Sequence, residues 1–133
     1  MRFMMLMIPA VKEENWMPSA EAVGAMTKFN QDMINAGVML TGEGLHPPSK
    51  GARVSFGPST RPGQAGAPKI TDGPFAEAKE VVGGYWMIQA KSKAEAVEWA
   101  RRCPAAPGDV IEIRQVMEMS DFPEDVQKAA GHK

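Results

Sequence analysis

The chain has 133 residues, 23% of them charged, and a formal net charge of −1 at pH 7. This length suits a single domain that buries roughly two thirds of its unfolded surface around one core. A nearly neutral chain lacks the basic field that holds a nucleic acid backbone, which excludes direct nucleic acid binding as the leading function.

The first predicted strand, residues 2–8, is apolar on both faces. Alternation along the strand gives each face three apolar side chains, which are Phe3, Met5 and Met7 on one side and Met4, Leu6 and Ile8 on the other. Helices can cover one face, and a small domain has little left to cover the second. A second copy of the chain is the simplest cover, so the sequence predicts a homodimer.

A helix is predicted after Pro18, because the Ser19 side chain can cap free backbone amides and apolar residues then recur at helical spacing. The apolar positions are Ala22, Met26, Phe29, Met33 and Ala36. Gly37 ends this helix as a left-handed cap. Residues 38–41 form the second predicted strand. It leads into a loop or an irregular sheet edge at residues 42–48, whose two prolines exclude a central strand position.

A hairpin is predicted in the middle of the chain. Residues 53–56 form one arm and residues 69–71 form a short returning arm. The stretch between them, residues 57–68, is so rich in glycine and proline that we expect a turn or hairpin tip. The returning arm leads into a turn at Asp72.

A second strongly apolar strand is predicted at residues 81–90, where Gly83 and Gly84 indicate a bulge or the close approach of another backbone. Ser92 and Glu95 predict a capping box at the start of a second helix. In such a box the serine side chain accepts a hydrogen bond from the backbone amide of the glutamate, and the glutamate side chain accepts one from the backbone amide of the serine.

The last predicted strand, residues 110–117, alternates so that Ile111, Ile113 and Gln115 share one face. The order of elements predicts an α+β fold, a ferredoxin-like βαββαβ arrangement with an inserted hairpin and both helices on one face of the sheet. We expect one domain over residues 1–119 and a flexible C-terminal tail over residues 120–133, with a weak helical tendency near its middle.

Three features bear on location and cofactors. The only cysteine, Cys103, cannot form an intrachain disulfide, and residues 1–10 do not resemble a signal peptide. No apolar run approaches the roughly 20 residues that cross a bilayer. We expect a cytoplasmic protein without membrane contact. No residues show metal-ligand spacing, so we expect no metal and no other cofactor.

A run of six residues, TDGPFA at residues 71–76, is followed by Glu77, Lys79 and Glu80 and then by GGYW at residues 83–86. This pattern resembles the DGPF branch of the YCII-related family. Three other stretches resemble it as well: GEGL with Pro47, AVEWA at residues 96–100 and IEIR at residues 111–114. The resemblance covers residues 2–119 and implies a dimeric α+β barrel with a cleft between strands.

Two classes of function follow from this resemblance. Proteins like YCII imply a paired histidine and aspartate, and a related dehydrochlorinase is similar to them, which favours an enzyme or a small-molecule binding protein. Genes of the DGPF branch often lie beside extracytoplasmic-function sigma factors, which favours a non-catalytic regulatory partner of a sigma factor. The resemblance supplies no substrate.

Asp72 and His46 are the predicted catalytic residues, in a cleft near Asp72 that binds or transforms a small polar or aromatic metabolite. A desolvated aspartate serves as a general base, and a histidine that Asp72 orients serves as the acid. The alternatives are structural. Asp72 before glycine and proline can be a turn carboxylate that accepts backbone amides, and a loop histidine beside prolines can simply be exposed.

Glu43, Arg114 and Tyr85 are the predicted ligand-binding residues. Arg114 can hold a carboxylate through two parallel hydrogen bonds. The alternative for the two charged residues is an ordinary surface ion pair that contributes less than about 1 kcal/mol. Tyr85 and Trp86 lie on opposite faces of one strand, so only one of them can face a given pocket, and we expect Trp86 to lie in the core.

Two further stretches have structural explanations. Cys103 lies at a helix end whose partial negative charge raises a thiol pKa, so we expect an inert thiol. The charged residues 77–80 are expected to form a solvated turn.

Overall fold

A four-stranded antiparallel sheet forms the centre of the molecule in the computed structural model, which describes residues 1–75 and 81–131. The strands are β1 (Arg2–Ile8), β2 (Met39–Gly44), β5 (Gly84–Gln89) and β6 (Val110–Gln115), in the order β2-β5-β1-β6. This order, with a helix after β1 and another after β5, confirms the ferredoxin-like α+β prediction. The turn predicted at residues 77–80 lies outside the described residues.

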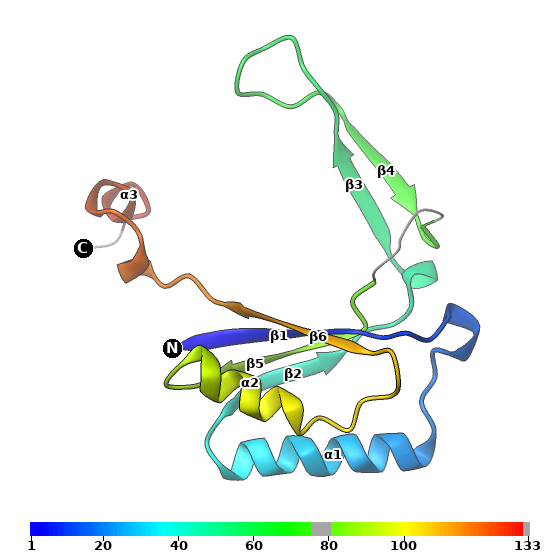
Figure 1. The fold of residues 1–133 in the computed structure, drawn as a ribbon. Helices are drawn as coiled ribbons and strands as arrows, with labels where there is room; N and C mark the ends of the chain where they lie inside the picture. Colours follow the sequence, from blue (N-terminus) through cyan, green and yellow to red (C-terminus); the bar gives the residue numbers. More distant parts are fainter. Residues whose placement is uncertain (76–80, 132–133) are drawn as a thin grey trace.

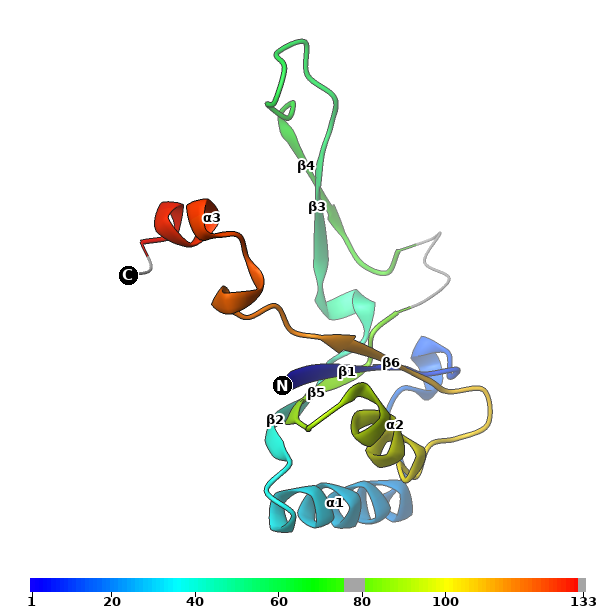
Figure 2. The ribbon, with the colours of Figure 1, turned by 60° about the vertical axis from the view of Figure 1, so that its left-hand side comes forward.

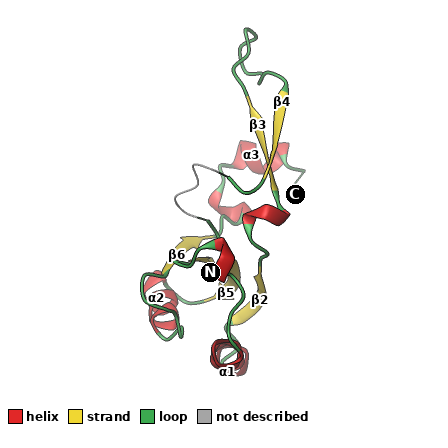
Figure 3. Cartoon of the chain, turned by 90° about the vertical axis from the view of Figure 1, so that its right-hand side faces the viewer, coloured by secondary structure: helices red, strands yellow, loops and turns green. Residues whose placement is uncertain are grey.

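Two helices cover one face of the sheet, α1 (Ala20–Asn35) and α2 (Lys93–Arg101), as Figures 1 and 3 show. Ser19 caps α1 by accepting the amide of Ala22 at 3.1 Å, as predicted. Gly37 has a φ of +72°, the left-handed conformation expected of a residue that ends a helix. The helix boundaries therefore follow from local sequence chemistry.

The hydrophobic core lies between these helices and the sheet. Its buried residues are Phe3, Met5, Phe29, Met33, Val38, Trp86, Ile88, Ala90 and Ala96. Trp86 is in the core, as predicted, and its indole Nε1 donates a hydrogen bond to Oδ1 of Asn30 at 2.8 Å. The ring of Phe29 meets the Trp86 ring edge-on, with centroids 5.9 Å apart.

The opposite face of the sheet, which we call the open face, has no covering layer among the described residues. Register places apolar side chains in its middle, and these are Met4, Leu6, Ile8, Tyr85 and Met87, each half-buried. Polar residues of the edge strands, including Glu43 and Arg114, flank them. One chain thus forms an open sheet and not a closed barrel, so the barrel that the resemblance implies needs a second sheet.

A hairpin rises from the open-face side as a separate two-stranded sheet of β3 (Ala52–Phe56) and β4 (Pro68–Asp72), shown in Figures 1 and 2. Both strands are exposed along their whole length. The inserted hairpin is confirmed, with arms slightly longer than predicted. The chain then returns to β5 at the base of this hairpin.

Two local predictions need correction. Ser92 accepts the amide of Glu95 at 3.2 Å, but the Glu95 carboxylate accepts the amide of Lys91 at 3.3 Å and not that of Ser92, so the capping box is only half formed. β5 begins at Gly84 and not at Val81. Val81 and Val82 are outside the ladder with β1, whereas the amide of Gly83, just before the strand, donates to the carbonyl of Met7 on β1 at 2.8 Å.

The C-terminal segment leaves β6 and forms two short helices, a 3₁₀ turn η3 (Met119–Asp121) and the helix α3 (Glu124–Ala129). The helical tendency predicted near residue 124 is therefore confirmed. Arg2 on β1 holds the start of this segment, because its guanidinium donates to both carboxylate oxygens of Glu118, at 2.6 and 3.1 Å. The segment stands on the open-face side of the sheet (Figure 3).

Candidate functional site

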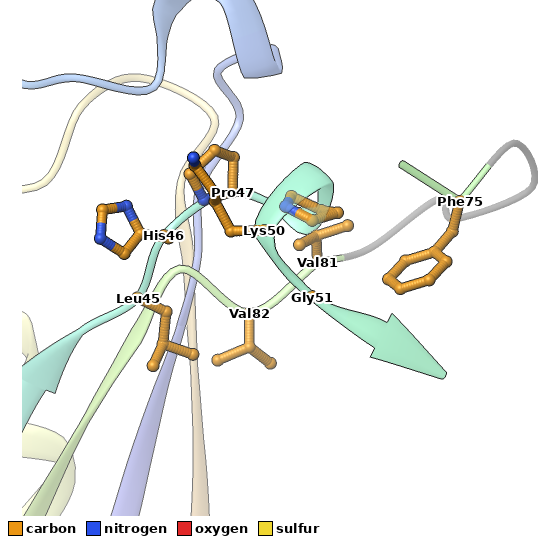
Figure 4. A pocket seen from close by; sticks show the side chains of 9 residues that line it. Leu45, His46, Pro47, Lys50, Gly51, Phe75, Val81 and Val82 are labelled. Carbon is orange, nitrogen blue, oxygen red and sulfur yellow. The ribbon is translucent and has the colours of Figure 1, made fainter. Parts of the chain in front are cut away.

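A cleft of about 330 Å³ lies where the hairpin joins the sheet, a volume that suits a small metabolite. Figure 4 shows it from close by. Its lining comes from the loop after β2, the short turn that precedes β3 and the chain on both sides of residues 76–80. The lining residues are Leu45, His46, Pro47, Pro48, Lys50, Gly51, Phe75, Val81 and Val82.

Backbone hydrogen bonds fix one wall of the cleft. The amide of Leu45 donates to the carbonyl of Gly83 at 2.9 Å, which ties the loop after β2 to the chain before β5. The indole Nε1 of Trp16 donates to the carbonyl of Leu45 at 2.9 Å. Leu45 is therefore held from both sides, and the loop that carries His46 starts from a fixed point.

Gly73 fixes the other wall through a close approach of two backbones. A Cβ atom added to Gly73 would lie 1.7 Å from the carbonyl oxygen of Pro48, in the 3₁₀ turn η2 (Pro48–Lys50). The Gly73 amide donates to the carbonyl of Gly51 at 2.9 Å. Only glycine fits here, because any side chain would push β4 away from η2.

Phe75 follows this contact and lines the cleft. The guanidinium of Arg53 on β3 lies over its ring, 4.1 Å from the centroid, a cation–π geometry that contributes about 0.5–1 kcal/mol at exposed sites. The run from Asp72 to Phe75 thus has a clear structural role. It attaches the hairpin to η2 and places an aromatic ring in the cleft wall.

The two predicted catalytic residues occupy different positions relative to the cleft. His46 is one of its lining residues and is exposed. Asp72 is the last residue of β4, opposite Ala52, and its exposed side chain is not part of the lining. Within the described residues, no hydrogen bond or ion pair joins Asp72 to His46, and neither side chain bonds to another protein group.

The three predicted ligand-binding residues lie on the open face and outside the cleft lining. Glu43 and Tyr85 are direct neighbours across β2 and β5. Arg114 lies on the far edge strand β6, and its Nη1 pairs with the carboxylate of Glu112 at 3.5 Å, where both side chains are exposed. The structure therefore brings Glu43 and Tyr85 together and leaves Arg114 apart from them.

The model of the YCII-related domain family matches residues 1–120. The chain belongs to the YCII-related domain family. The match spans the whole sheet, the hairpin and every residue that lines the cleft. No curated protein matches the chain.

Two cleft residues of this YCII-related chain were missed from the sequence. Lys50 ends η2 and is, with His46, one of two residues with an ionisable side chain in the lining. The signal was present in the sequence Pro47-Pro48-Ser49-Lys50, since prolines at the start of a short helical turn fix where the next residues lie. Phe75 enters the sequence prediction only as part of a motif, yet it lines the cleft, on the side away from His46 (Figure 4).

The chemistry of the cleft is therefore that of an apolar pocket with a cationic rim. Proline, valine, leucine and phenylalanine side chains offer surface to an apolar or aromatic group. The ammonium group of Lys50 offers a charge to an anionic group. In residues 1–75 and 81–131, no three His, Cys, Asp or Glu side chains gather as a metal site, and no helix is long and apolar enough to cross a membrane.

Cys103 lies away from the cleft, at the end of α2. Burial, and secondarily the carboxylate of Asp109, raise the pKa of its thiol to about 11. The raised pKa agrees with the expectation of an inert thiol, and its larger cause is desolvation instead of the partial charge of the helix end.

Proposed function

We propose that this YCII-related protein binds, and transforms, a small metabolite with an apolar or aromatic body and an anionic group, in the cleft at the base of the hairpin. The observation that supports the proposal is the lining itself, which is apolar except for His46 and Lys50. The ring of Phe75 stacks on the body of the ligand, and Lys50 pairs with its anionic group.

His46 is the proton donor in this proposal, because an imidazole can serve as a general acid and the His46 side chain lines the cleft. Asp72 is the proton acceptor for a ligand group that extends out of the cleft, because its side chain lies outside the lining. It ends β4 three residues before Phe75, and its carboxylate makes no hydrogen bond within the described part of the chain that binding would have to break. Glu43, Tyr85 and Arg114 would contact a ligand only from the open face.

The binding step is tested with aromatic carboxylates and their uncharged amides, measured by thermal shift on the whole chain. A carboxylate present at 100 times its Kd stabilises the folded state by about 2.7 kcal/mol, and the amide stabilises it less. Lys50→Ala should weaken carboxylate binding about tenfold, whereas Lys69→Ala, a cation on the hairpin outside the lining, should leave it unchanged. Equal binding by both variants would contradict the proposed anion contact.

The catalytic step has its own test. His46→Gln and Asp72→Asn keep the size of each side chain and remove proton transfer. With a ligand that wild type both binds and converts, each variant should bind normally and lose turnover about 100-fold or more. Unchanged turnover in Asp72→Asn would leave Asp72 with a turn role only.

A homodimer is the second part of the proposal, with membership of the DGPF branch and a cytoplasmic location as predictions that accompany it. It is supported by the open face, whose apolar centre has no cover among the described residues. Light scattering at micromolar concentration should give about twice the chain mass. A stable monomer would contradict it.

The alternative function is a regulatory partner of an extracytoplasmic-function sigma factor, without catalysis. The exposed apolar residues of the hairpin, such as Phe56 and Ile70, support a protein contact of this kind. A purified sigma factor should then co-elute with the wild-type chain. Failure to co-elute, together with ligand-induced stabilisation, would favour the metabolite proposal.

A further inference from the structure

A second cavity lies on the helix side of the sheet, between α1 and the end of α2 (Figures 1 and 3). Its volume is about 250 Å³, and we call it the helix groove. Of the described residues, none lines both this groove and the cleft at the base of the hairpin. The lining residues of the groove are Ala25, Lys28, Phe29, Asp32, Trp99, Arg102 and Pro104. The proposed function makes no use of them.

Two aromatic side chains form the apolar floor of the helix groove. Phe29 on α1 is 5% exposed, and its ring packs edge-on against Trp86 of the core, with centroids 5.9 Å apart. Trp99 on α2 is half-buried and packs against the same core. Core contacts therefore hold both rings in place before a ligand arrives, which lowers the entropic cost of binding.

Charged side chains of both signs stand at the rim of the groove. α1 contributes Lys28 and Asp32, which lie one helical turn apart and form an exposed pair, Nζ to Oδ2, at 3.4 Å. Arg102, which directly follows α2, contributes a guanidinium that lies 4.4 Å from the centroid of the Trp99 ring. The rim therefore offers one carboxylate and two cations beside an aromatic floor.

Arg102 is the group of this rim that is ready to bind an anion. Within the described residues its guanidinium has no carboxylate partner, whereas the neighbouring Arg101, outside the groove, pairs with Glu98 at 2.9 Å. A guanidinium over an aromatic ring keeps N–H donors at its edge, and such donors bind a carboxylate through two parallel hydrogen bonds. Asp32 is available as well, because an exposed ion pair such as that with Lys28 contributes little and exchanges its partner easily.

These groups together favour one class of small molecule, whose aromatic ring lies on the apolar floor. A ligand with only an anionic group would lie beside the Asp32 carboxylate, and one with only a cationic group would lie beside Arg102 and Lys28. Either arrangement places like charges together, which is unfavourable. A free aromatic amino acid matches both signs. The volume of the groove, below the roughly 300–1,000 Å³ of pockets for drug-sized ligands, also favours a ligand of this size.

We propose that the helix groove binds a free aromatic amino acid, with its ring on Trp99 and Phe29, its carboxylate on Arg102 and its ammonium on Asp32. This is a second site, on the other face of the sheet from the hairpin, and it does not depend on the proposed function of the cleft. Binding requires no rearrangement of the core, because core contacts already hold the two rings.

The test observes the three tryptophans of the full chain separately, in ¹H–¹⁵N spectra. Trp99 lines the groove, Trp16 bonds to the cleft wall and Trp86 lies in the core, so each indole N–H reports on one region. Each signal is assigned by replacing its tryptophan with phenylalanine. Added L-phenylalanine should shift the Trp99 signal with a Kd of about 1 mM or tighter and leave the Trp16 signal in place. No shift of Trp99 at about 10 mM, or a shift of Trp16 instead, would overturn the proposal.

Analogues of phenylalanine test each contact in turn. Hydrocinnamate lacks the ammonium, phenylalaninamide lacks the carboxylate and alanine lacks the ring, and each should bind about tenfold more weakly or worse. N-acetylphenylalaninamide keeps the ring and loses both charges, so it should not shift the Trp99 signal. Binding of this neutral compound would assign the groove to an aromatic side chain of a protein partner, and equal binding of hydrocinnamate would assign it to a simple anion. Either result overturns the proposal.

Two adjacent arginines give a matched pair of variants. Arg102→Gln removes the partner of the carboxylate and should weaken phenylalanine binding about tenfold or more, whereas Arg101→Gln, outside the groove lining, should leave it unchanged. Asp32→Asn should weaken phenylalanine binding by a similar factor and leave hydrocinnamate binding as tight or tighter, because only phenylalanine carries an ammonium. All three side chains are exposed, so circular dichroism should show an unchanged fold. An equal loss in both arginine variants would contradict the contact with Arg102.

Discussion

Gly73→Ala tests whether the close backbone approach at the base of the hairpin holds the cleft together. The added Cβ would lie 1.7 Å from the carbonyl oxygen and 2.5 Å from the carbonyl carbon of Pro48. Both atoms are backbone, so no side-chain rotation relieves the overlap. Either β4 or η2 must move until the contact reaches an ordinary distance.

The cost follows from three terms. Forced displacement of packed structure costs about 1–3 kcal/mol. The movement also lengthens or breaks the hydrogen bond from the Gly73 amide to the Gly51 carbonyl, which contributes about 1 kcal/mol. Alanine also lowers the entropy of the unfolded chain, which stabilises the folded state by about 0.4–1 kcal/mol. The net loss is about 2 kcal/mol, or about 7 °C in Tm for a chain of this length.

The assay is urea and thermal denaturation at one protein concentration, followed by circular dichroism. Gly57→Ala is the matched control, since it lies in the same hairpin and a Cβ there meets nothing within 4 Å. It should unfold at or slightly above the wild-type midpoint. If Gly73→Ala behaves like Gly57→Ala, the backbone contact does not hold the hairpin and the structural account of the motif is wrong.

Three other predictions concern the core, the thiol and the terminal ion pair. Trp86→Phe removes the hydrogen-bond donor to Asn30 and should lower the free energy of unfolding in urea by about 2 kcal/mol. A hydrogen bond typically contributes about 1 kcal/mol, so a loss below about 0.5 kcal/mol would mean that this one contributes nothing. Cys103, whose pKa is raised to about 11, should react with a thiol reagent at pH 8 roughly 200-fold more slowly than a free thiol, and rapid labelling would refute its burial. The hydrogen bond from Arg2 lowers the pKa of Glu118 in the folded protein. The stabilisation by this ion pair is therefore present above the ordinary glutamate pKa and is lost as the pH falls through the pKa of Glu118 in the folded state. Glu118→Gln should therefore reduce the fall in Tm that accompanies acidification. An unchanged fall in Tm would contradict the ion pair between Arg2 and Glu118.

The fold was predictable because its determinants are local. Ser19 caps α1 at the expected residue, and the alternating apolar residues of β1 set which face packs on the helices. The incorrect prediction of a complete capping box also concerned local structure. Glu95 bonds the Lys91 amide instead of the Ser92 amide, because a side chain chooses between two neighbouring donors on geometry that sequence spacing does not specify.

The candidate site was predictable only in part. His46 was found because histidine is rare in this chain and titrates near neutral pH. Lys50 was not, because an exposed lysine has no sequence signature until the η2 turn and Phe75 place it beside a cleft. Contacts between segments far apart in the chain depend on tertiary packing, which the local pattern does not contain.

The run from Asp72 to Phe75 now has a physical explanation. Gly73 is required by the Pro48 carbonyl, and Phe75 is held by the Arg53 guanidinium. These residues are required by steric contacts at the base of the hairpin. The run is therefore evidence of the fold, since any protein with the same hairpin base has the same contacts to satisfy. Selection among ligands then depends on the loop after β2, whose His46 and Lys50 side chains make no hydrogen bond within the described residues. Exchanging those two residues should change which ligand binds while the hairpin keeps its place, whereas changing Gly73 should move the hairpin whatever the ligand.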